Sequence, residues 1–384
     1  MPCTVPCTVL WARAVLAIEV FGVLGRAGPS CFLGVNRYLR PMEKRDKPAT
    51  DLRLKRRIED LIAYKGGGHN SELVGDIIEN ALKLLHDVED RGDVRVIQTA
   101  LRELRYAFRL FAPYADQRKV TVFGSARTKP DEPEYQQAAE FARQMAAAGW
   151  MVITGAGPGI MQAGHEGAGP ARSFGANIRL PWEQTANPVI QGDKKLIQFK
   201  YFFTRKLTFL RHADALALFP GGFGTLDEGY EALTLMQTGK SQLMPLVLVE
   251  PPGGTYWKTW DRHVRDHLLR DQLIAPDDLN LYQITYSADE AVKVITRFYR
   301  NFQSTRFVKD LLVIRLKNAP SETALAAINE DFTDIVTGAP FKVIKPTPEE
   351  TEDNDRLDLA RVAFGFNRRD YGRLRQLIDV LNGL

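Results

Sequence analysis

One segment of the sequence has the residue types and spacing of an anion-binding turn, Pro220-Gly-Gly-Phe-Gly-Thr-Leu-Asp-Glu228. Its three glycines within four positions leave backbone N–H groups accessible, and Thr225 adds a hydroxyl. A strand-like run precedes the segment and a helical pattern follows it, so the positive end of a helix dipole points at the turn. This arrangement predicts a site for an anion, most economically a phosphate.

Two carboxylates follow in the first helical turn, and they would repel a phosphate that they faced. Glu228 lies three residues after Thr225, which is the spacing of a capping box, so capping of the helix is one interpretation. In the other interpretation, Glu228 faces the sugar side of a bound nucleotide and the helix dipole holds it as an anion. The sequence leaves both open.

A second group with chemical potential is the cationic pair Arg205-Lys206, at the start of the helix before the strand at Asp214. Both side chains could lie near the same strand ends as the glycine-rich turn. Two adjacent cations cannot share one helix face, so we expect at most one of them to point directly inward. A solvated pair is the alternative.

A second glycine-rich loop, Gly155-Ala-Gly157-Pro-Gly159-Ile-Met161, opens a helix after a strand. It differs from the dinucleotide fingerprint because Ile160 stands where the third glycine belongs, and the next strand offers Asn177 and Arg179 but no acid. NAD and FAD are therefore not expected, and no ATP-binding P-loop sequence occurs. The loop could bring its backbone close to a ligand, or it could be only a tight turn.

The elements that would position these loops alternate between strand and helix. Buried-type strands are expected at 119–124, 150–154, 176–180, 213–219 and 245–249, with helices between them. This alternation predicts an α/β fold, a Rossmann-like doubly wound parallel sheet covered on both faces. Ligands of such sheets bind at the carboxyl ends of the strands, where all the glycine-rich loops fall.

Four regions are expected along the chain: a leader at 1–41, a helical cap at 42–116, the Rossmann-like domain at 117–304 and a small α+β module at 305–384. All three cysteines lie in the leader, so the rest of the chain has no thiol nucleophile, Cys-based zinc site or disulfide. We expect Met42 to be the true start. A targeting segment and an extra helix are the alternatives for the leader.

The two flanking regions contain features that could be mistaken for sites. Gly66-Gly67-Gly68 follows a helix rather than a strand, so it predicts a flexible linker and not a phosphate cradle. In the module, strands are expected at 310–316, 341–344 and 361–366, and helices at 321–335 and 371–381. The acids of 349–358 and the arginines of 368–375 are expected to match internally or to be solvated, and an effector-anion site on the arginines is the alternative.

The composition sets further limits. The chain has 384 residues, is 45% hydrophobic and 26% charged, and carries a net charge of +4. These values are typical of a globular protein, and the nearly neutral body has no basic footprint for nucleic acid. No uncharged apolar run is long enough to span a membrane. We therefore expect a cytoplasmic protein without nucleic-acid or membrane partners, and no metal site.

The segment Pro220–Glu228 resembles the P-G-G-x-G-T-x-x-E signature of the LONELY GUY family, once labelled lysine-decarboxylase-like. Arg205-Lys206, Gly124-Ser125 and the loop from Gly155 to Met161 also fit, and the resemblance covers roughly 119–300. It implies Arg205 and Glu228 as the catalytic pair. The substrate-binding residues that it implies are Gly124, Ser125, Gly155, Gly157, Gly159, Met161, Glu183, Lys206, Gly221, Gly222, Phe223, Gly224, Thr225, Asp227 and Thr234.

The resemblance further implies a nucleoside 5′-monophosphate phosphoribohydrolase that works without a cofactor and forms a homodimer or a higher homo-oligomer. Glu228 would orient the ribose hydroxyls and stabilise positive charge, or activate water, and Arg205 would hold the substrate. The flanking regions make the chain similar to the long bacterial branch, so AMP or another common monophosphate is the expected substrate. The alternatives are a cytokinin-nucleotide hydrolase, a non-catalytic nucleotide sensor, and a lyase or transferase acting on a phosphorylated sugar.

Overall fold

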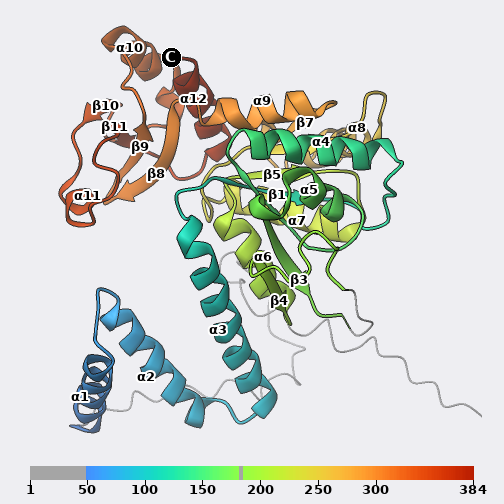
Figure 1. The fold of residues 1–384 in the computed structure, drawn as a ribbon. Coiled ribbons are helices and arrows are strands. Elements are labelled where there is room, and N and C mark those ends of the chain that lie inside the picture. The colour runs from blue at the N-terminus through green and yellow to red at the C-terminus, as the bar shows by residue number, and fades with distance from the viewer. Residues whose placement is uncertain (1–48, 181–184) are drawn as a thin grey trace, which may run out of the picture. The chain divides into compact units, whose positions relative to one another are not determined.

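The computed structural model describes residues 49–180 and 185–384 (Figure 1). The expected leader at 1–41 and Glu183 lie outside the described residues. The described chain divides into two compact units, one ending at Asp87 and the other spanning Val88–Leu384. The expected domain boundaries at 116 and 304 stay predictions.

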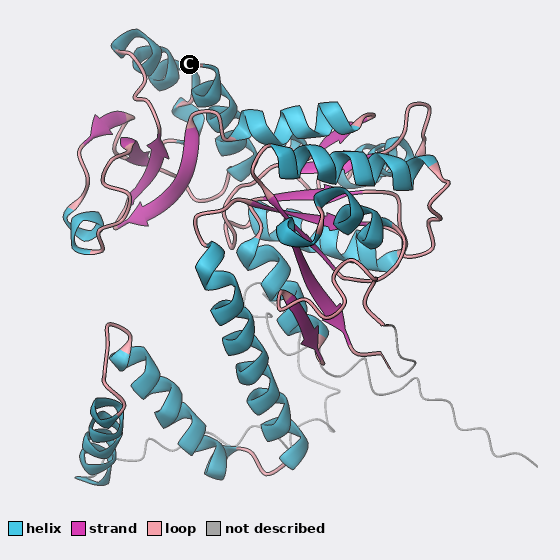
Figure 2. Ribbon diagram, in the orientation of Figure 1, coloured by secondary structure: helices cyan, strands magenta, loops and turns pink. Residues whose placement is uncertain are grey.

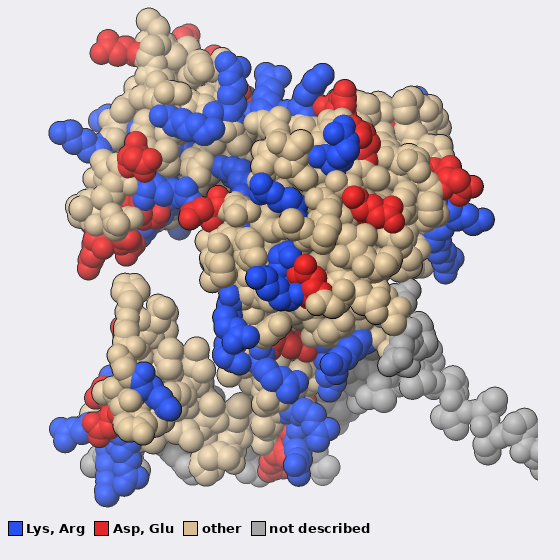
Figure 3. Space-filling view, in the orientation of Figure 1, with Lys and Arg blue, Asp and Glu red and all other residues tan. Residues whose placement is uncertain are grey.

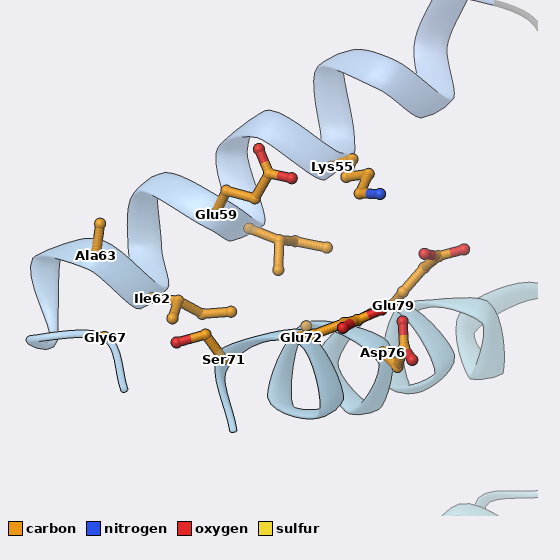
Figure 4. Close-up of a pocket in the computed structure, with 11 residues that line it drawn as sticks. Lys55, Glu59, Ile62, Ala63, Gly67, Ser71, Glu72, Asp76 and Glu79 are labelled. Carbon is orange, nitrogen blue, oxygen red and sulfur yellow. The ribbon is translucent and has the colours of Figure 1, made fainter. Parts of the chain in front are cut away.

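The smaller unit consists of helices α1 (Ala49–Tyr64) and α2 (Ser71–Asp87). The turn between them contains Gly66, Gly67 and Gly68, all with positive φ, a conformation that glycine adopts without strain. The two helices enclose a cavity of about 490 Å³. Figure 4 shows Glu72, Asp76 and Glu79 of α2 on the side of this cavity that faces Lys55 and Glu59 of α1.

The larger unit is built on a parallel sheet with the strand order β4-β3-β2-β1-β5-β6-β7. The first four strands in chain order are β1 (Lys119–Phe123), β2 (Met151–Thr154), β3 (Ser173–Ile178) and β4 (Leu196–Phe199). The others are β5 (Ala215–Leu218), β6 (Leu246–Val249) and β7 (Gln283–Thr285). The predicted Rossmann-like doubly wound sheet is confirmed.

Helices cover both faces of this sheet. In Figure 1, α4 (Pro133–Ala147) and α9 (Ala288–Phe298) lie side by side above the sheet, whereas α6 (Phe202–His212) and α7 (Phe223–Gln237) lie below it. Helix α5 (Ile160–Ala168) packs against α4, and α8 (Tyr256–His263) continues into a short π-helical turn. The strands between them are almost fully buried, as parallel strands must be when both faces are covered.

The strands predicted from the sequence differ from those of the sheet in a few places. The strand expected at 176–180 begins earlier, because Ser173, Phe174 and Gly175 already pair with β2. Strands β4 and β7 were not expected. They form the two edges of the sheet, where some of their residues are exposed, so neither gives the continuous apolar run of a fully buried strand.

Helix α3 (Arg91–Phe111) fixes the start of α6, on which the cationic pair lies. Its Glu103 is buried and accepts hydrogen bonds from the Lys200 N–H and the Thr204 hydroxyl, both at 2.7 Å. At its C-terminal end, the Phe111 ring stacks on Phe174 of β3 and on His212 of α6. This helix falls within the region expected to form a helical cap, and it braces the turn that precedes Arg205.

The C-terminal part is an antiparallel sheet of order β10-β11-β9-β8 with three helices (Figure 2). Its strands are β8 (Phe302–Val308), β9 (Leu311–Leu316), β10 (Lys342–Ile344) and β11 (Ala360–Gly365). Its helices are α10 (Glu322–Asp331), α11 (Pro348–Glu352) and α12 (Tyr371–Gly383). The predicted small α+β module is confirmed, with β8 and α11 as unexpected additions.

The acids of this module are matched internally. The buried carboxylate of Glu350 accepts hydrogen bonds from Nε of Arg315 at 2.8 Å and from Nε of Arg361 at 3.0 Å. Arg306 binds both Asp353 and Asp355. The predicted internal match is confirmed for these acids, but their partners come from the strands rather than from the later arginines, of which Arg368 lies over the Phe307 ring.

The surface carries both signs of charge. Figure 3 shows lysine and arginine side chains spread over the visible face with aspartate and glutamate among them. Among the described residues, no helix is long and apolar enough to span a membrane.

The buried ion pairs of Glu350 give a prediction for stability. Burial raises the pKa of Glu350, but the Thr347 N–H and the two guanidinium groups outweigh burial and lower this pKa to about 2. Glu350→Gln leaves two buried guanidinium groups without their charge partner, so the unfolding free energy at pH 7 should fall by about 3–5 kcal/mol in denaturant titration.

Glu352→Gln is the matched control, because this acid lies exposed on the same helix. The stabilisation by Glu350 should be complete above pH 4.5 and be lost as the pH falls toward 2, since the unfolded state binds the proton first. Equal stability of the two variants would contradict the prediction.

Candidate functional site

The candidate site lies where the chain changes direction across the sheet. Strands β1 and β5 are neighbours, but the connection after β1 leads toward β2 and the one after β5 leads toward β6. The ends of the two strands are tied together by the Ser125 N–H, which donates to the Pro220 carbonyl at 3.1 Å. A cavity of about 710 Å³ opens there, at the position where doubly wound sheets bind ligands.

The turn after β5 provides backbone donors to this cavity. The first intrahelical bonds of α7 are donated by Thr225 and Leu226 to the Gly222 carbonyl, so the N–H groups of Phe223 and Gly224 precede them and are available to a ligand. A Cβ on Gly221 would collide with the Thr225 hydroxyl, so the tightness of the turn requires glycine. The Tyr256 hydroxyl fixes the turn by donating to the Gly221 carbonyl at 2.6 Å. This geometry suits an anion.

Glu228 lines the cavity from the second turn of α7. Its side chain is buried, and its Oε2 has no hydrogen-bond partner among the described residues. The capping interpretation fails, because Gly222 rather than Thr225 is the N-cap of α7 and no side chain caps it. Burial raises the pKa of Glu228 to about 7, although the charges of Lys206 and Arg205 oppose this shift.

Arg205 lines the same cavity from α6. Its guanidinium carbon lies 5.1 Å from the ring centre of Phe209 and 5.8 Å from that of Phe202, and its Nε has no partner among the described residues. Burial lowers the pKa of Arg205, and the nearby Glu228 carboxylate opposes this effect. Arg205 and Glu228 together place an open cationic group and an open acid beside one cavity.

Lys206 differs from its neighbour, as expected for two adjacent cations on a helix. Its Nζ lies 2.9 Å from Asp227 and 2.6 Å from Glu231. Burial lowers the pKa of Lys206, but the hydrogen bonds to Glu231 and Asp227 outweigh it and raise this pKa. The lysine thus neutralises acids on α7, which leaves Arg205 as the cation of this pair that borders the cavity.

The loop after β2 forms the back of the site. Its glycines are buried and do not line the cavity, but each allows a close approach: Gly155 to Arg205, Gly157 to Met161, and Gly159, at φ 65°, to the Ser125 carbonyl. Met161 itself lines the cavity. The role of these glycines in this structure is therefore to let other groups pack closely against the loop backbone.

The structure brings most of the expected site residues to this cavity. They are Gly124, Ser125, Met161, Arg205, Gly221, Gly222, Phe223, Gly224, Thr225, Asp227 and Glu228. Thr234 is exposed two turns further along α7, where its hydroxyl donates to the Tyr230 carbonyl, and it does not line the cavity. Glu183 lies outside the described residues.

Several residues of the site were not among the predicted ones. Phe202 and Arg127 line the cavity, and Tyr256 supports its anion turn. Arg127 follows the Gly124-Ser125 strand end by two residues, which is a signal that could have identified it. Nothing in the sequence links Tyr256 to Gly221. Among the described residues, no group of three or more His, Cys, Asp or Glu side chains could hold a metal ion.

The fold and the site define an α/β protein of the Rossmann-like class, with an anion turn and an acid–guanidinium pair at its switch point. Residues 157–295 match the family described as "Possible lysine decarboxylase". This match confirms, for the central region, the family resemblance that the glycine-rich segments indicated.

A curated relative is the pyrimidine/purine nucleotide 5′-monophosphate nucleosidase of Escherichia coli strain K12. It is 30% identical over 144 residues, which are 35% of this chain. The matched region spans about a third (32%) of the relative's length. The same nucleosidase from strain O157:H7 matches to the same extent.

Two solved structures are similar to part of this chain. The molybdenum cofactor binding protein from Rippkaea orientalis is 22% identical and covers 47% of this chain and 96% of its own, with a TM-score of 0.33. The molybdenum cofactor carrier protein from Chlamydomonas reinhardtii is 19% identical and covers 47% of this chain and 97% of its own, with a TM-score of 0.34.

The anion turn gives a prediction that separates two of its glycines. Gly221→Ala places a methyl group against the Thr225 side chain and the Ser125 N–H, so it should lower the unfolding free energy by about 1–3 kcal/mol. Gly224→Ala meets nothing within 4 Å and lies in a helix, so it should be neutral or stabilise by up to about 1 kcal/mol. Denaturant titration measures both, and a Gly221 variant as stable as the Gly224 variant would contradict the prediction.

Proposed function

We propose that this protein is a nucleoside 5′-monophosphate phosphoribohydrolase, which cleaves the N-glycosidic bond of a nucleotide with water. The observation that carries the proposal is the buried Glu228, whose Oε2 is open toward a cavity that Arg205 and the anion turn also border. The similarity to the Escherichia coli nucleosidase and the family match support the same reaction class.

The chemistry can be assigned to the residues present. The N–H groups of Phe223 and Gly224 and the Thr225 hydroxyl would hold the 5′-phosphate at the positive end of α7. That placement would bring the ribose toward Glu228, which lies in the next turn of the same helix. Arg205 would hold the substrate without donating a proton, because a guanidinium does not readily deprotonate.

Glu228 would act on the charge that develops during cleavage. As the C1′–N bond breaks, its electron pair leaves with the base and the ribose becomes oxocarbenium-like, a cation that a carboxylate stabilises. Water forms the new C1′–O bond and its proton passes to the base nitrogen, so the products are the free base and ribose 5-phosphate. No step requires a cofactor.

The substrate proposal is AMP or a similarly common monophosphate. The enzyme would act in the cytoplasm, where such nucleotides are abundant. The roles proposed for the cavity residues account for a phosphate and a sugar and assign no residue to the base, which agrees with a relative that is described as acting on both pyrimidine and purine nucleotides. Selectivity for cytokinin nucleotides has no observation that favours it.

The direct test is release of free base from each common nucleoside monophosphate, followed by chromatography. Glu228→Gln should lower kcat by more than tenfold, that is by more than about 1.4 kcal/mol of transition-state stabilisation. Since Glu228 acts ionised and its pKa is raised to about 7, kcat/KM of the native protein should rise with pH through about 7. The Gln variant should lose this rise, and the pH dependence that remains should be only that of the ionisation of the substrate phosphate.

Two controls accompany the assay. Glu330→Gln, at an exposed acid of α10, should have native activity. Above pH 7, the unfolding free energy of Glu228→Gln should be up to about 3 kcal/mol higher than that of the native protein. The reason is that ionisation of a buried acid with a raised pKa destabilises the folded state as the pH rises. Binding of monophosphates without release of any base would refute the hydrolase and favour the nucleotide sensor.

We also propose that the protein forms a homodimer through an apolar surface made by α3 and α6. On α3, Ile97, Leu101 and Phe108 are more than 40% exposed. On the adjoining α6, Phe202, Phe203 and Leu207 are exposed to a similar degree. Aromatic and aliphatic side chains gathered at this density are typical of an interface. Phe202 also lines the cavity, so the interface would border the site.

The dimer is tested by light scattering after gel filtration of the full chain. The native protein should have about twice its chain mass of 43.2 kDa. Phe203→Glu should shift it to the monomer, because a charge in the centre of an apolar interface costs several kcal/mol. Leu273→Glu, at an exposed apolar residue elsewhere, should leave the dimer intact. A native protein that is monomeric at all concentrations would overturn the proposal.

A further inference from the structure

His165 on α5 is a buried imidazole that does not line the cavity. Its Nε2 lies 3.0 Å from the Phe174 carbonyl and 3.1 Å from the Thr154 hydroxyl. Its Nδ1 lies 3.1 Å from the side-chain nitrogen of Asn187 and 3.3 Å from the side-chain oxygen of the same residue. Both ring nitrogens are therefore committed to groups of the protein interior.

These contacts define which nitrogen carries the proton. A carbonyl oxygen can only accept, so Nε2 donates to Phe174, and Nδ1 is then the acceptor for the Asn187 amide. Burial lowers the pKa of His165, and the hydrogen bond that Nε2 donates to Phe174 only partly opposes this shift. The ring is thus neutral, with one donor and one acceptor in fixed directions.

Asn187 links His165 to the loop after β2 through two further hydrogen bonds. Its side-chain nitrogen has a second hydrogen, which it donates to the Gly157 carbonyl at 3.1 Å, and its backbone N–H donates to the Ala156 carbonyl at 2.8 Å. Ala156 is held at φ 61°, a left-handed conformation that costs energy for a non-glycine residue, and its own N–H donates to the Thr154 hydroxyl at 3.0 Å.

The loop in turn limits where two cavity residues can lie. A Cβ on Gly155 would meet the Arg205 guanidinium, and a Cβ on Gly157 would lie 2.7 Å from the methyl carbon of Met161. The loop backbone is thus in close contact with both side chains. A shift of the Ala156–Gly157 backbone would open or close the space that Arg205 and Met161 occupy.

We propose that His165 and Asn187 are positioning residues, which hold the Gly155–Gly159 loop so that Arg205 keeps its place in the site. His165 fixes the orientation of the Asn187 amide, and Asn187 fixes the two loop carbonyls. This inference rests on the proposed function only for its effect on turnover, because the link to the loop is structural.

Replacing His165 by asparagine or by glutamine separates this role from simple packing, because each amide side chain can replace only one of the two ring nitrogens. The side chain of His165→Asn can place an acceptor near the position of Nδ1 and so keep the bond from Asn187. The side chain of His165→Gln reaches the position of Nε2 and keeps the bond to Phe174, but it leaves Asn187 without its acceptor. Loss of one buried hydrogen bond corresponds to about a tenfold effect.

The first readout is hydrogen–deuterium exchange of the amides of 155–161, which requires no activity. Exchange should be at least about tenfold faster in His165→Gln and within about threefold of native in His165→Asn. The second is turnover of the nucleotide that the native protein hydrolyses: kcat should fall by about tenfold or more in the Gln variant, and the Asn variant should restore it.

Asn187→Ala provides a second route if His165→Gln does not fold. It should accelerate hydrogen exchange of the same amides. In the double variant with His165→Gln the two effects should not add, because both substitutions remove the same linkage. Unchanged exchange in the loop, or equal effects of the Asn and Gln variants, would overturn the proposal. If the native protein hydrolyses no nucleotide, the proposed function fails, and the exchange data still decide the positioning role.

Discussion

Parallel strands β1 and β5 lie side by side, and the chain leaves them in opposite directions. No helix can cover the space that this divergence leaves at their carboxyl ends, so a cavity is a geometric result of the strand order. The bond from the Ser125 N–H to the Pro220 carbonyl ties the edges of this cavity together. The placement of Arg205, Glu228 and the glycine-rich turns depends on this single constraint, because each follows or faces one of the diverging strands.

The cavity also explains why the acid in it is unusual. Glu228 lies within a helix rather than at its N-cap, so it is removed from water on all sides except the cavity, and burial raises its pKa. Lys206 could have neutralised it directly, but that side chain is engaged by Asp227 and Glu231. At neutral pH the site therefore keeps one acid close to its midpoint of ionisation, and among the described residues its Arg205 guanidinium has no ion-pair partner within bonding distance. Such a state suits chemistry better than stability.

Much of this arrangement could be predicted from the sequence. The fold follows from apolar strand runs that alternate with helices, and the anion turn from three glycines next to a helix start. The role of Thr225 could not be decided, because cap and third helical residue differ only in where the helix begins. Lys206 could not be oriented without knowing that Asp227 and Glu231 face it from another helix. His165, Asn187 and Tyr256 act through contacts between segments far apart in the chain, for which local spacing gives no signal.

One consequence follows from the far end of α7. The helix begins at the anion turn, and past its last residue, Gln237, the ring of Tyr371 from α12 lies against Gly239 so closely that a side chain there would collide with it. A helix of 15 residues behaves as a stiff rod of about 22 Å. Helix α12 thus packs directly against the turn that ends the helix carrying Glu228. The C-terminal module therefore supports the far end of the helix that carries Glu228, although none of its residues lines the cavity.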